Sequence, residues 1–179
     1  METVYVGLGG NIGDAVDYLN LALKEISAIS HLTALQSSNF YSTTPVGFQD
    51  QNTFVNAVCS FKTSLSLKEL HKELQRIEIK LGKRPKVKFA PRKIDLDILF
   101  FGEQTYCDGD LCIPHPSWND RLFVLIPLSE LISEITIKRN SEEQINQYNI
   151  YKLLKTFPNK HQETVTFLTK PRCLGSVDE

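Results

Sequence analysis

The chain has 179 residues and a formal net charge of −1, with 41% hydrophobic and 23% charged residues. This length and composition favour a single compact domain over residues 1–179, and the near-neutral charge argues against a general attraction to nucleic acid or to an anionic membrane. No apolar run approaches the roughly 20 residues needed to cross a bilayer, and the N-terminus lacks a basic segment followed by an apolar core, so we expect a cytoplasmic protein without a signal peptide.

The first half of the chain predicts a strand, a helix and two further strands. Residues 3–8 are rich in β-branched and aromatic residues and end at a glycine-rich turn. Apolar residues at helical spacing follow over residues 19–29. We expect the next strands within residues 32–41 and over residues 54–61, separated by a loop that contains proline and glycine.

The clearest element is a helix that begins after Ser66. Ser66 and Glu69 form a capping-box pattern, and five apolar residues at spacings of three and four form one stripe that ends at Leu81. Gly82 suits the C-terminal cap of this helix.

A fourth strand is expected over residues 94–101. A hairpin around Asp108-Gly109 and an apolar helix over residues 122–131, with a break at Pro127, complete the better-patterned part of the chain. The order β-α-β-β-α-β is the split-βαβ arrangement of an α+β fold, in which helices pack on a largely antiparallel sheet.

The last part of the chain, residues 138–179, is more polar. It predicts one helix over residues 145–154 and one short strand over residues 164–168.

The four cysteines are irregularly spaced, and none makes a CxxC pair. Such spacing indicates neither a zinc site nor a disulfide framework, so we expect four reduced thiols. The residues are Cys59, Cys107, Cys112 and Cys173.

Asp95 and Asp97 are the strongest candidates for a metal site. Side chains alternate along a strand, so the two carboxylates share one face about 7 Å apart. Two such charges repel each other unless a cation lies between them, and carboxylates together with substrate phosphates are typical ligands of Mg²⁺. The alternative is a solvated strand face. The residues expected on the opposite, apolar face are Ile94, Leu96, Ile98 and Phe100.

A basic loop precedes these aspartates, since six of the eleven residues from Lys83 to Lys93 are Lys or Arg. The loop either neutralises the carboxylates at the surface or closes over a polyanion that the metal holds. Cationic clamps together with magnesium recur in phosphoryl transfer. The chain has no Walker A loop and no dinucleotide fingerprint, so a nucleotide site must be built in another way.

Further candidates follow on both sides of the aspartates. His115 stands between two prolines and before Arg121, and it is either structural or a hydrogen-bond donor to phosphate. Phe54 and Asn56 share a strand face, and with Phe123 they suit a planar heterocycle. The alternative is that both phenylalanines belong to the core.

Five segments, in order, closely resemble the family of 6-hydroxymethyl-7,8-dihydropterin pyrophosphokinases (HPPK). They are GLGGNIGD at 7–14, FYSTTPVGFQDQNTFVNA at 40–57, QRIEIKLGK at 75–83, PRKIDLDILFFG at 91–102 and IPHPSWNDRLFVLIPL at 113–128. The resemblance implies a ferredoxin-like fold with αβα layers, in which residues 1–135 form the catalytic core and residues 136–179 a divergent C-terminal segment. It also implies transfer of the β,γ-diphosphate of ATP to the pterin hydroxymethyl group, with release of AMP, in folate biosynthesis.

The resemblance implies roles for individual residues. Two Mg²⁺ ions that bridge the phosphates would be held by Asp95 and Asp97. The expected catalytic residues are Lys83, Arg92, Asp97 and His115. The expected ATP-binding residues are Gln75, Glu78, Lys83, Arg92, Ile98, His115 and Arg121. The expected pterin-binding residues are Thr43, Val46, Phe54, Asn56 and Phe123.

The chain departs from the family at Phe54, where Tyr is common, at Lys83, where Arg is common, and at Phe89-Ala90, where Trp-Gly is common. Lysine keeps the charge of arginine but cannot donate two parallel hydrogen bonds to phosphate, which alters the expected closure of the basic loop.

Two rival functions stay open: a metal-dependent phosphohydrolase, and a non-catalytic ferredoxin-like module that binds nucleotide or RNA. The expected partners are ATP and the pterin, without nucleic acid or membrane, and we expect a monomer.

Overall fold

This computed structural model describes residues 1–44, 52–83, 93–138, 145–158 and 163–172. The described residues form a main sheet of six strands in the order β10-β3-β4-β1-β5, with β2 also paired to β4. Every strand pair in it is antiparallel, as expected. The strands are β1 (Glu2–Gly10), β2 (Leu32–Ser37), β3 (Phe40–Thr43), β4 (Phe54–Thr63), β5 (Asp95–Phe101) and β10 (Val165–Thr169).

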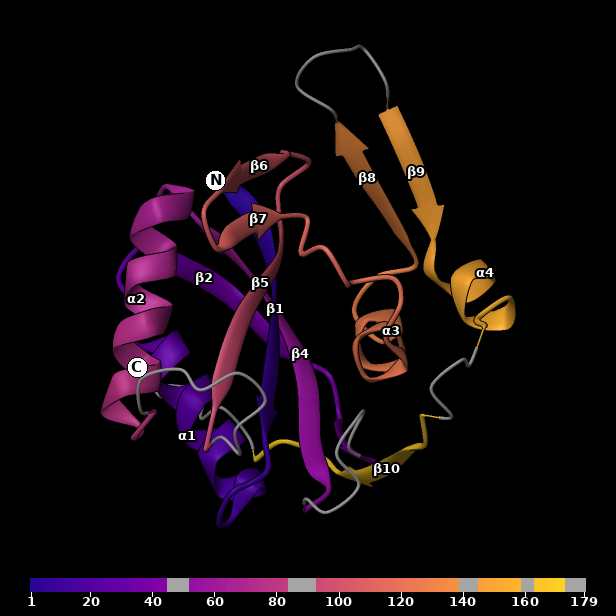
Figure 1. Cartoon of the computed structure of the whole chain (residues 1–179). Helices are drawn as coiled ribbons and strands as arrows, with labels where there is room; N and C mark the ends of the chain where they lie inside the picture. Colours follow the sequence, from indigo (N-terminus) through magenta and orange to yellow (C-terminus); the bar gives the residue numbers. More distant parts are fainter. Residues whose placement is uncertain (45–51, 84–92, 139–144, 159–162, 173–179) are drawn as a thin grey trace.

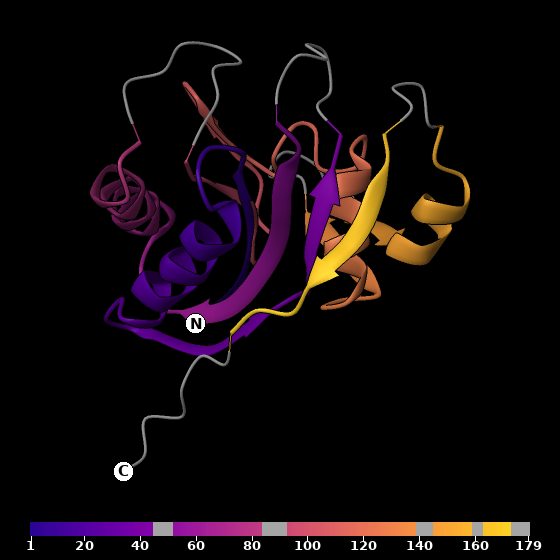
Figure 2. The same ribbon diagram turned by 90° about the horizontal axis from the view of Figure 1, so that it is seen from below.

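Helices cover both faces of this sheet, which confirms the αβα layers (Figure 1, Figure 2). Helices α1 (Ala15–Ser27) and α2 (Leu67–Lys80) lie on one face, over a core that includes Val4, Val6 and Leu8 of β1. Helix α3 (Leu122–Ser129) packs against β4, β3 and β10 on the other face, and α4 (Ile150–Lys155) packs against α3. We call these the α1/α2 face and the α3 face.

Helix α2 follows its sequence pattern closely. The Ser66 hydroxyl accepts a hydrogen bond from the Glu69 backbone N–H, and the Glu69 carboxylate accepts one from the Ser66 backbone N–H over 2.8 Å. Its apolar stripe is buried against the sheet, and Gly82 follows the helix with a φ of +90°, a conformation that glycine adopts without strain.

The strand expected within residues 32–41 is two strands. The chain breaks between β2 and β3, where Ser38 exchanges hydrogen bonds with Val58: the Ser38 N–H donates to the Val58 carbonyl over 2.9 Å, and the Val58 N–H donates to the Ser38 hydroxyl over 3.0 Å. Both strands pair with β4, so the break leaves the split-βαβ order intact.

Strand β5 contains a bulge that the sequence pattern did not predict. Val6 of β1 lies opposite Ile98, whereas Tyr5 lies opposite Phe100, so Leu99 is an extra residue. Ile98 therefore packs on the α1/α2 face, while Leu99 and Phe100 both pack on the α3 face. The expectation that Phe100 shares the face of Ile98 is wrong, because the bulge reverses the alternation.

The expected hairpin is present as β6 (Tyr106–Asp108) and β7 (Leu111–Ile113). Its register places Cys107 directly opposite Cys112, with 4.1 Å between their Cα atoms, and the two form a disulfide. The expectation of four reduced thiols is therefore wrong for this pair. Cys59 is a free, buried thiol, and Cys173 lies outside the described residues.

The C-terminal part differs most from expectation. Residues 145–149 are not helical but form β9 (Ile145–Asn149), which pairs with β8 (Glu134–Lys138) in a hairpin, and α4 begins only after Asn149. The reason is tertiary, since Tyr148 of β9 packs edge-on against Trp118 with 5.2 Å between ring centroids.

Pro127 does not end α3 but lies inside it. No helix among the described residues is long and apolar enough to span a membrane.

Candidate functional site

Several of the candidate residues lie on the α3 face of the sheet near Gly9 of β1. In the register of the sheet, Gly9 lies opposite Asn56 of β4 on one side and opposite Asp95 of β5 on the other. Directly opposite residues of antiparallel strands project to the same face. A Cβ atom added at Gly9 would lie 2.8 Å from Oδ1 of Asn56, closer than real contacts allow. The glycine therefore leaves the sheet open between an amide and a carboxylate.

The two aspartates lie as the alternation of β5 predicts. Leu96 between them is buried in the core on the α1/α2 face, whereas Asp95 is half-buried and Asp97 is exposed on the opposite face. In register, Gly7 of β1 lies opposite Asp97, just as Gly9 lies opposite Asp95. Two glycines thus flank the carboxylates, so no side chain of β1 covers them on this face.

Lys83 connects the aspartates to helix α2. Its ammonium group donates a hydrogen bond to Oδ1 of Asp95 and another, over 2.5 Å, to Oε1 of Glu78. The same Glu78 oxygen accepts the backbone N–H of Leu96 over 2.7 Å. Glu78 is thereby fixed to the strand that carries Asp95, and the structure brings together three residues that the sequence analysis had singled out separately.

Burial and ion pairing act in opposite directions on the pKa values of this cluster. Burial raises the pKa of Glu78 to about 7, although Lys83 and the Leu96 N–H act in the opposite direction. For Lys83, burial alone would lower the pKa, but the hydrogen bonds to Asp95 and Glu78 outweigh it, so the pKa is raised. The ammonium group of Lys83 is therefore charged at neutral pH.

The chemistry of the donor set fits magnesium that arrives with phosphate. The described residues contain no group of three or more His, Cys, Asp or Glu side chains that could hold a metal by itself. They do offer the hard carboxylates of Asp95 and Asp97, one of which already holds a cationic group, the Lys83 ammonium. Mg²⁺ commonly binds one or two carboxylates and completes its coordination with water and substrate phosphates.

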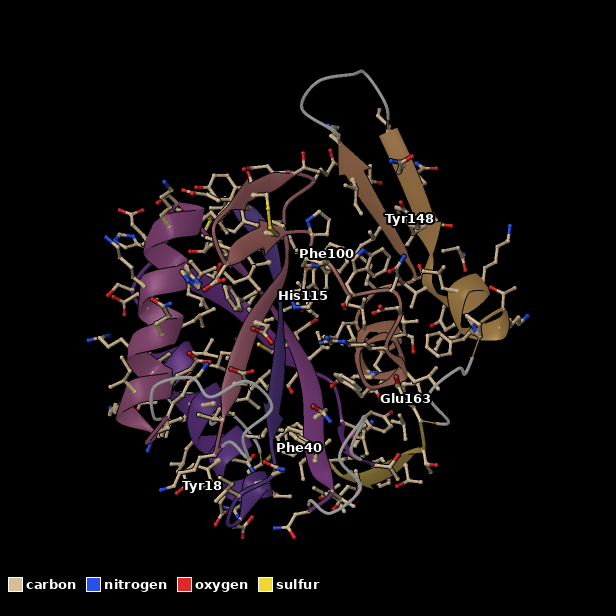
Figure 3. All side chains as sticks on the ribbon, in the orientation of Figure 1. Tyr18, Phe40, Phe100, His115, Tyr148 and Glu163 are labelled. Carbon is tan, nitrogen blue, oxygen red and sulfur yellow. A yellow bond between two sulfur atoms is a disulfide. The ribbon has the colours of Figure 1, made fainter. Side chains whose placement is uncertain are left out.

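His115 lies beside β5 (Figure 3), and the charges of Asp97 and Arg121 both act on its imidazole. Its backbone N–H donates to the Leu99 carbonyl over 3.0 Å, and its Nδ1 accepts the Ser117 N–H over 3.2 Å. Burial lowers the pKa of His115, and nearby Asp97 only partly opposes this. The imidazole is therefore neutral at pH 7, and because Nδ1 is an acceptor, Nε2 carries the one available N–H donor.

The residues expected to bind a planar ring lie on the other side of Gly9. The Asn56 amide nitrogen donates to the Thr43 hydroxyl over 2.8 Å, and both residues are buried. Phe54 lies on the same face of β4 and is half-buried. Phe123 of α3 is also half-buried, and the Arg121 guanidinium lies 5.6 Å from its ring centroid. Neither phenylalanine is fully buried in the core.

Four expected residues are not placed with this group. Val46 and Arg92 lie outside the described residues. Gln75 is exposed on α2, three residues before Glu78. The side chain of Ile98 is buried on the α1/α2 face, away from the aspartate side chains, so any contact with ATP would have to use its backbone.

Glu163 has a structural role that the sequence did not predict, because no site residue was expected in the C-terminal segment. The buried Glu163 carboxylate accepts the backbone N–H of Leu122 over 2.7 Å, at the start of α3. The neighbouring strand β10 pairs Val165 with Thr43, and the Thr44 N–H donates to the Thr164 carbonyl over 3.2 Å. The C-terminal segment therefore supports both α3 and the Thr43 end of β3. A lone glutamate in a polar stretch gives no sequence signal for this contact.

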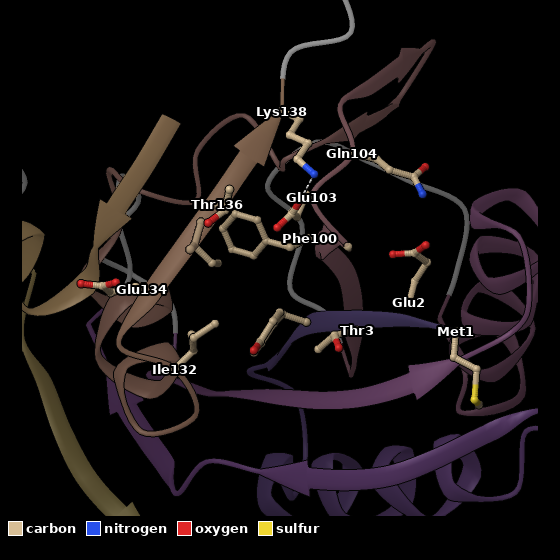
Figure 4. A pocket seen from close by; sticks show the side chains of 13 residues that line it. Met1, Glu2, Thr3, Phe100, Glu103, Gln104, Ile132, Glu134, Thr136 and Lys138 are labelled. Atoms are coloured by element: carbon tan, nitrogen blue, oxygen red, sulfur yellow. Dashed lines mark ion pairs between the residues drawn. The ribbon is translucent and has the colours of Figure 1, made fainter. Parts of the chain in front are cut away.

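A separate hollow of about 630 Å³ lies between β1, β5 and β8 (Figure 4). Tyr5 and Phe100 contribute to its wall, and the Lys138–Glu103 ion pair lies at its edge. It contains none of the candidate residues, because it is at the Glu2 end of β1 and the candidate residues are at the Gly9 end.

Comparison with known proteins gives one consistent family. The family described as 7,8-dihydro-6-hydroxymethylpterin-pyrophosphokinase (HPPK) matches residues 5–133. The chain is 38% identical over 160 residues to the 2-amino-4-hydroxy-6-hydroxymethyldihydropteridine pyrophosphokinase of Haemophilus influenzae, covering 88% of this chain and 100% of that protein. It is 40% identical over 139 residues to the protein of the same name from Bacillus subtilis, covering 78% and 83% of the two chains.

The fold also matches a solved structure, the crystal structure of a Plasmodium falciparum HPPK-DHPS triple mutant, with a TM-score of 0.60 and 16% identity. The match covers 86% of this chain but 44% of the other, so this chain spans less than half of that protein. At this identity the likeness concerns the fold alone.

Proposed function

Because the chain belongs to the 7,8-dihydro-6-hydroxymethylpterin-pyrophosphokinase (HPPK) family, we infer that it transfers the diphosphate group of ATP to 6-hydroxymethyl-7,8-dihydropterin. The products are AMP and the pterin diphosphate, and the step belongs to folate biosynthesis. The observation that carries this conclusion is the match to the full length of the Haemophilus influenzae relative. Family membership also favours an enzyme over a non-catalytic nucleotide- or RNA-binding module.

We propose that Asp95 and Asp97 bind two magnesium ions together with the phosphates of ATP. Magnesium, when bound, would neutralise the phosphate charge and orient the chain of phosphates for in-line attack. In support, both carboxylates project from one face of β5, and Lys83 holds one of them in a defined position.

The nucleotide side of the proposal uses residues around β5 and α2. The Nε2–H of neutral His115 is proposed to donate to a phosphate oxygen and Arg121 to add a positive charge, and the acceptor role of His115 Nδ1 supports this assignment. Gln75, Glu78 and the Ile98 backbone complete the proposed ATP contacts. Arg92 is proposed as a further catalytic cation, although it lies outside the described residues.

We propose that the pterin occupies the surface between β4 and α3. Phe54 and Phe123 would stack on its two faces, and the Asn56 amide, oriented by its hydrogen bond to Thr43, would bind its edge. Val46 would add a backbone contact. Because Gly9 leaves the sheet open between Asn56 and Asp95, the hydroxymethyl group can approach the phosphates, and exposed Asp97 is a candidate to accept its proton.

We also propose one domain over residues 1–179, because β10 of the C-terminal segment is a strand of the main sheet. We propose, further, a monomer that acts in the cytoplasm, and the near-neutral charge argues against a nucleic-acid or anionic-membrane partner.

The test is an assay with ATP, magnesium and 6-hydroxymethyl-7,8-dihydropterin in which AMP and ADP are resolved. We expect one AMP for each pterin consumed, and no AMP when the pterin is omitted. Formation of ADP would overturn diphosphate transfer. Formation of AMP without pterin would indicate the rival phosphohydrolase.

A further inference from the structure

Lys83 has an unusual position for a residue proposed to contact phosphate. Its side chain is 15% exposed, and its ammonium group bridges the carboxylates of Glu78, 7% exposed, and Asp95, 18% exposed. The Lys83 ammonium is therefore hydrogen-bonded to a proposed magnesium ligand, Asp95, rather than exposed to solvent.

The backbone explains why Lys83 returns toward the sheet. The chain leaves α2 through a tight turn in which Gly82 has a φ of +90° and the Lys83 N–H donates to the Glu78 carbonyl over 2.9 Å. Lys83 is thus joined to Glu78 twice, by its backbone and by its side chain. Glu78 is in turn fixed to β5 through the Leu96 N–H. The contact of Lys83 with Asp95 joins two side chains only, so a ligand can replace it without disturbing the backbone, while Glu78 stays fixed through the Leu96 N–H.

We propose that Lys83 is the counter-ion of Asp95 in the nucleotide-free protein, and that Mg²⁺ arriving with ATP displaces it from Asp95 while Glu78 retains it at the site. This inference rests on the proposed function, because it takes Asp95 and Asp97 as magnesium ligands. It assigns Lys83 and Glu78 a positioning role that precedes the reaction.

Charge competition is the physical basis of the proposal. A magnesium ion held by Asp95 would compete for the carboxylate to which the Lys83 ammonium now donates its hydrogen bond. Two cations on one carboxylate repel each other strongly in a partly buried site, so each weakens the binding of the other. Glu78 remains as an anchor for the displaced ammonium, which keeps the charge close to the incoming phosphates. In the absence of ATP, the lysine therefore disfavours metal binding.

The experiment is a titration of the nucleotide-free protein with Mn²⁺, used as a paramagnetic substitute for Mg²⁺, with free Mn²⁺ measured by electron paramagnetic resonance. Lys83→Met and Lys83→Gln should each bind Mn²⁺ at least about tenfold more tightly than the wild type, because both remove the competing charge. Lys83→Gln retains a hydrogen-bond donor for Glu78, so a folded neutral variant is available even if Lys83→Met is unstable.

Two further variants serve as controls. Lys83→Arg restores the charge and should return the Mn²⁺ affinity to that of the wild type. Lys80→Met removes a nearby charge at the end of α2, but Lys80 is 62% exposed and pairs with Glu25 over 2.7 Å, so its loss should leave the affinity unchanged. A merely structural role of Lys83 would not give this dependence on charge.

The inference is overturned if neither neutral variant binds Mn²⁺ more tightly than the wild type, including the case in which none of the proteins binds it. It is also overturned if Lys80→Met tightens binding equally, since the effect would then be a general one of net charge. The titration contains no ATP and no pterin, so its result is independent of AMP formation. Failure of the AMP assay would overturn the proposed function, whereas failure of the titration would overturn only the role of Lys83.

Discussion

The carboxylate of Glu163 accepts a hydrogen bond from the backbone N–H of Leu122, with 2.7 Å between Oε2 and the nitrogen. Leu122 is the first residue of α3, and the preceding Arg121 gives this helix no side-chain cap. Glu163 therefore satisfies one of the unpaired N–H groups at the helix start, and its charge is favourable at this end of the helix dipole. Through this contact the C-terminal segment fixes the turn of α3 that carries Phe123.

Glu163→Ala should lower the free energy of unfolding by about 1–3 kcal/mol, because it leaves a backbone N–H without its buried partner. It should also weaken pterin binding more than ATP binding, since α3 carries Phe123 and Glu163 lies at its start. Urea unfolding and ligand titration measure the two effects. Glu103→Ala is the control: its ion pair with Lys138 is exposed, so the loss should stay below about 1 kcal/mol. Equal behaviour of the two variants would contradict a special role for Glu163.

Asp95→Ala and Asp97→Ala should each lower turnover at least about 100-fold, by analogy with the loss of one preorganised electrostatic group. The measurement is the rate of AMP formation at saturating magnesium. Asp110→Ala, at an exposed position in the turn between β6 and β7, should keep full activity. Full activity of either β5 variant would show that the two carboxylates are only a solvated strand face.

Gly9→Ala tests the open surface between Asn56 and Asp95. The new Cβ would lie 2.8 Å from Oδ1 of Asn56, so the amide must move, and pterin affinity should fall while ATP affinity changes little. Gly7→Ala is a matched control on the same strand and face, because its Cβ would lie 3.5 Å from Leu99, an ordinary contact. Isothermal titration with each ligand distinguishes the two variants. Unchanged pterin binding by folded Gly9→Ala would place the pterin elsewhere.

Phe123→Ala should weaken pterin binding by about 1–3 kcal/mol, taking base–aromatic stacking as a guide. ATP affinity should change little. Phe157→Ala removes another half-buried ring that packs against the core on the α3 face, and it should affect stability without selective loss of pterin binding. If Phe123→Ala weakens both ligands equally, Phe123 is a core residue rather than a stacking surface.

Cys59 should not react with iodoacetamide in the native protein. Burial raises the pKa of its thiol to about 12, so at pH 8 the thiolate fraction is on the order of 10⁻⁴, and the side chain is also inaccessible. Cys107 and Cys112 should be labelled only after reduction, because they form a disulfide. Mass-spectrometric mapping of the label, with and without reductant and urea, measures both. Rapid labelling of Cys59 without urea would show that β4 opens readily.

Much of the fold was predictable because local patterns and burial agree. The capping box at Ser66, the apolar stripe of α2 and the alternation around Asp95 and Asp97 each describe a local geometry that packing then preserved. The hairpin at Gly109 was predictable for the same reason, since its turn residues are adjacent in sequence.

Two of the errors come from packing between distant segments. The bulge at Leu99 places the side chain of Phe100 on the opposite face of the sheet from the one that simple alternation predicts. Tyr148 is part of a strand rather than a helix because β9 pairs with β8 and the Tyr148 ring contacts Trp118. The pairing of Cys107 with Cys112 depends on the exact hairpin register, which spacing alone does not fix.

The sequence by itself determined the family, the order of the central elements and the candidate residues, because these depend on residue type and on spacing along the chain. The tertiary structure alone decided which of them meet. It places Gly9 between Asn56 and Asp95. It also brings the Lys83 ammonium into hydrogen bonds with Asp95 and Glu78. The third contact is that of Glu163 with the start of α3. The physical reason is that strand register and the packing of helices on the sheet set these contacts, most of which join residues far apart in sequence, and local spacing does not determine them.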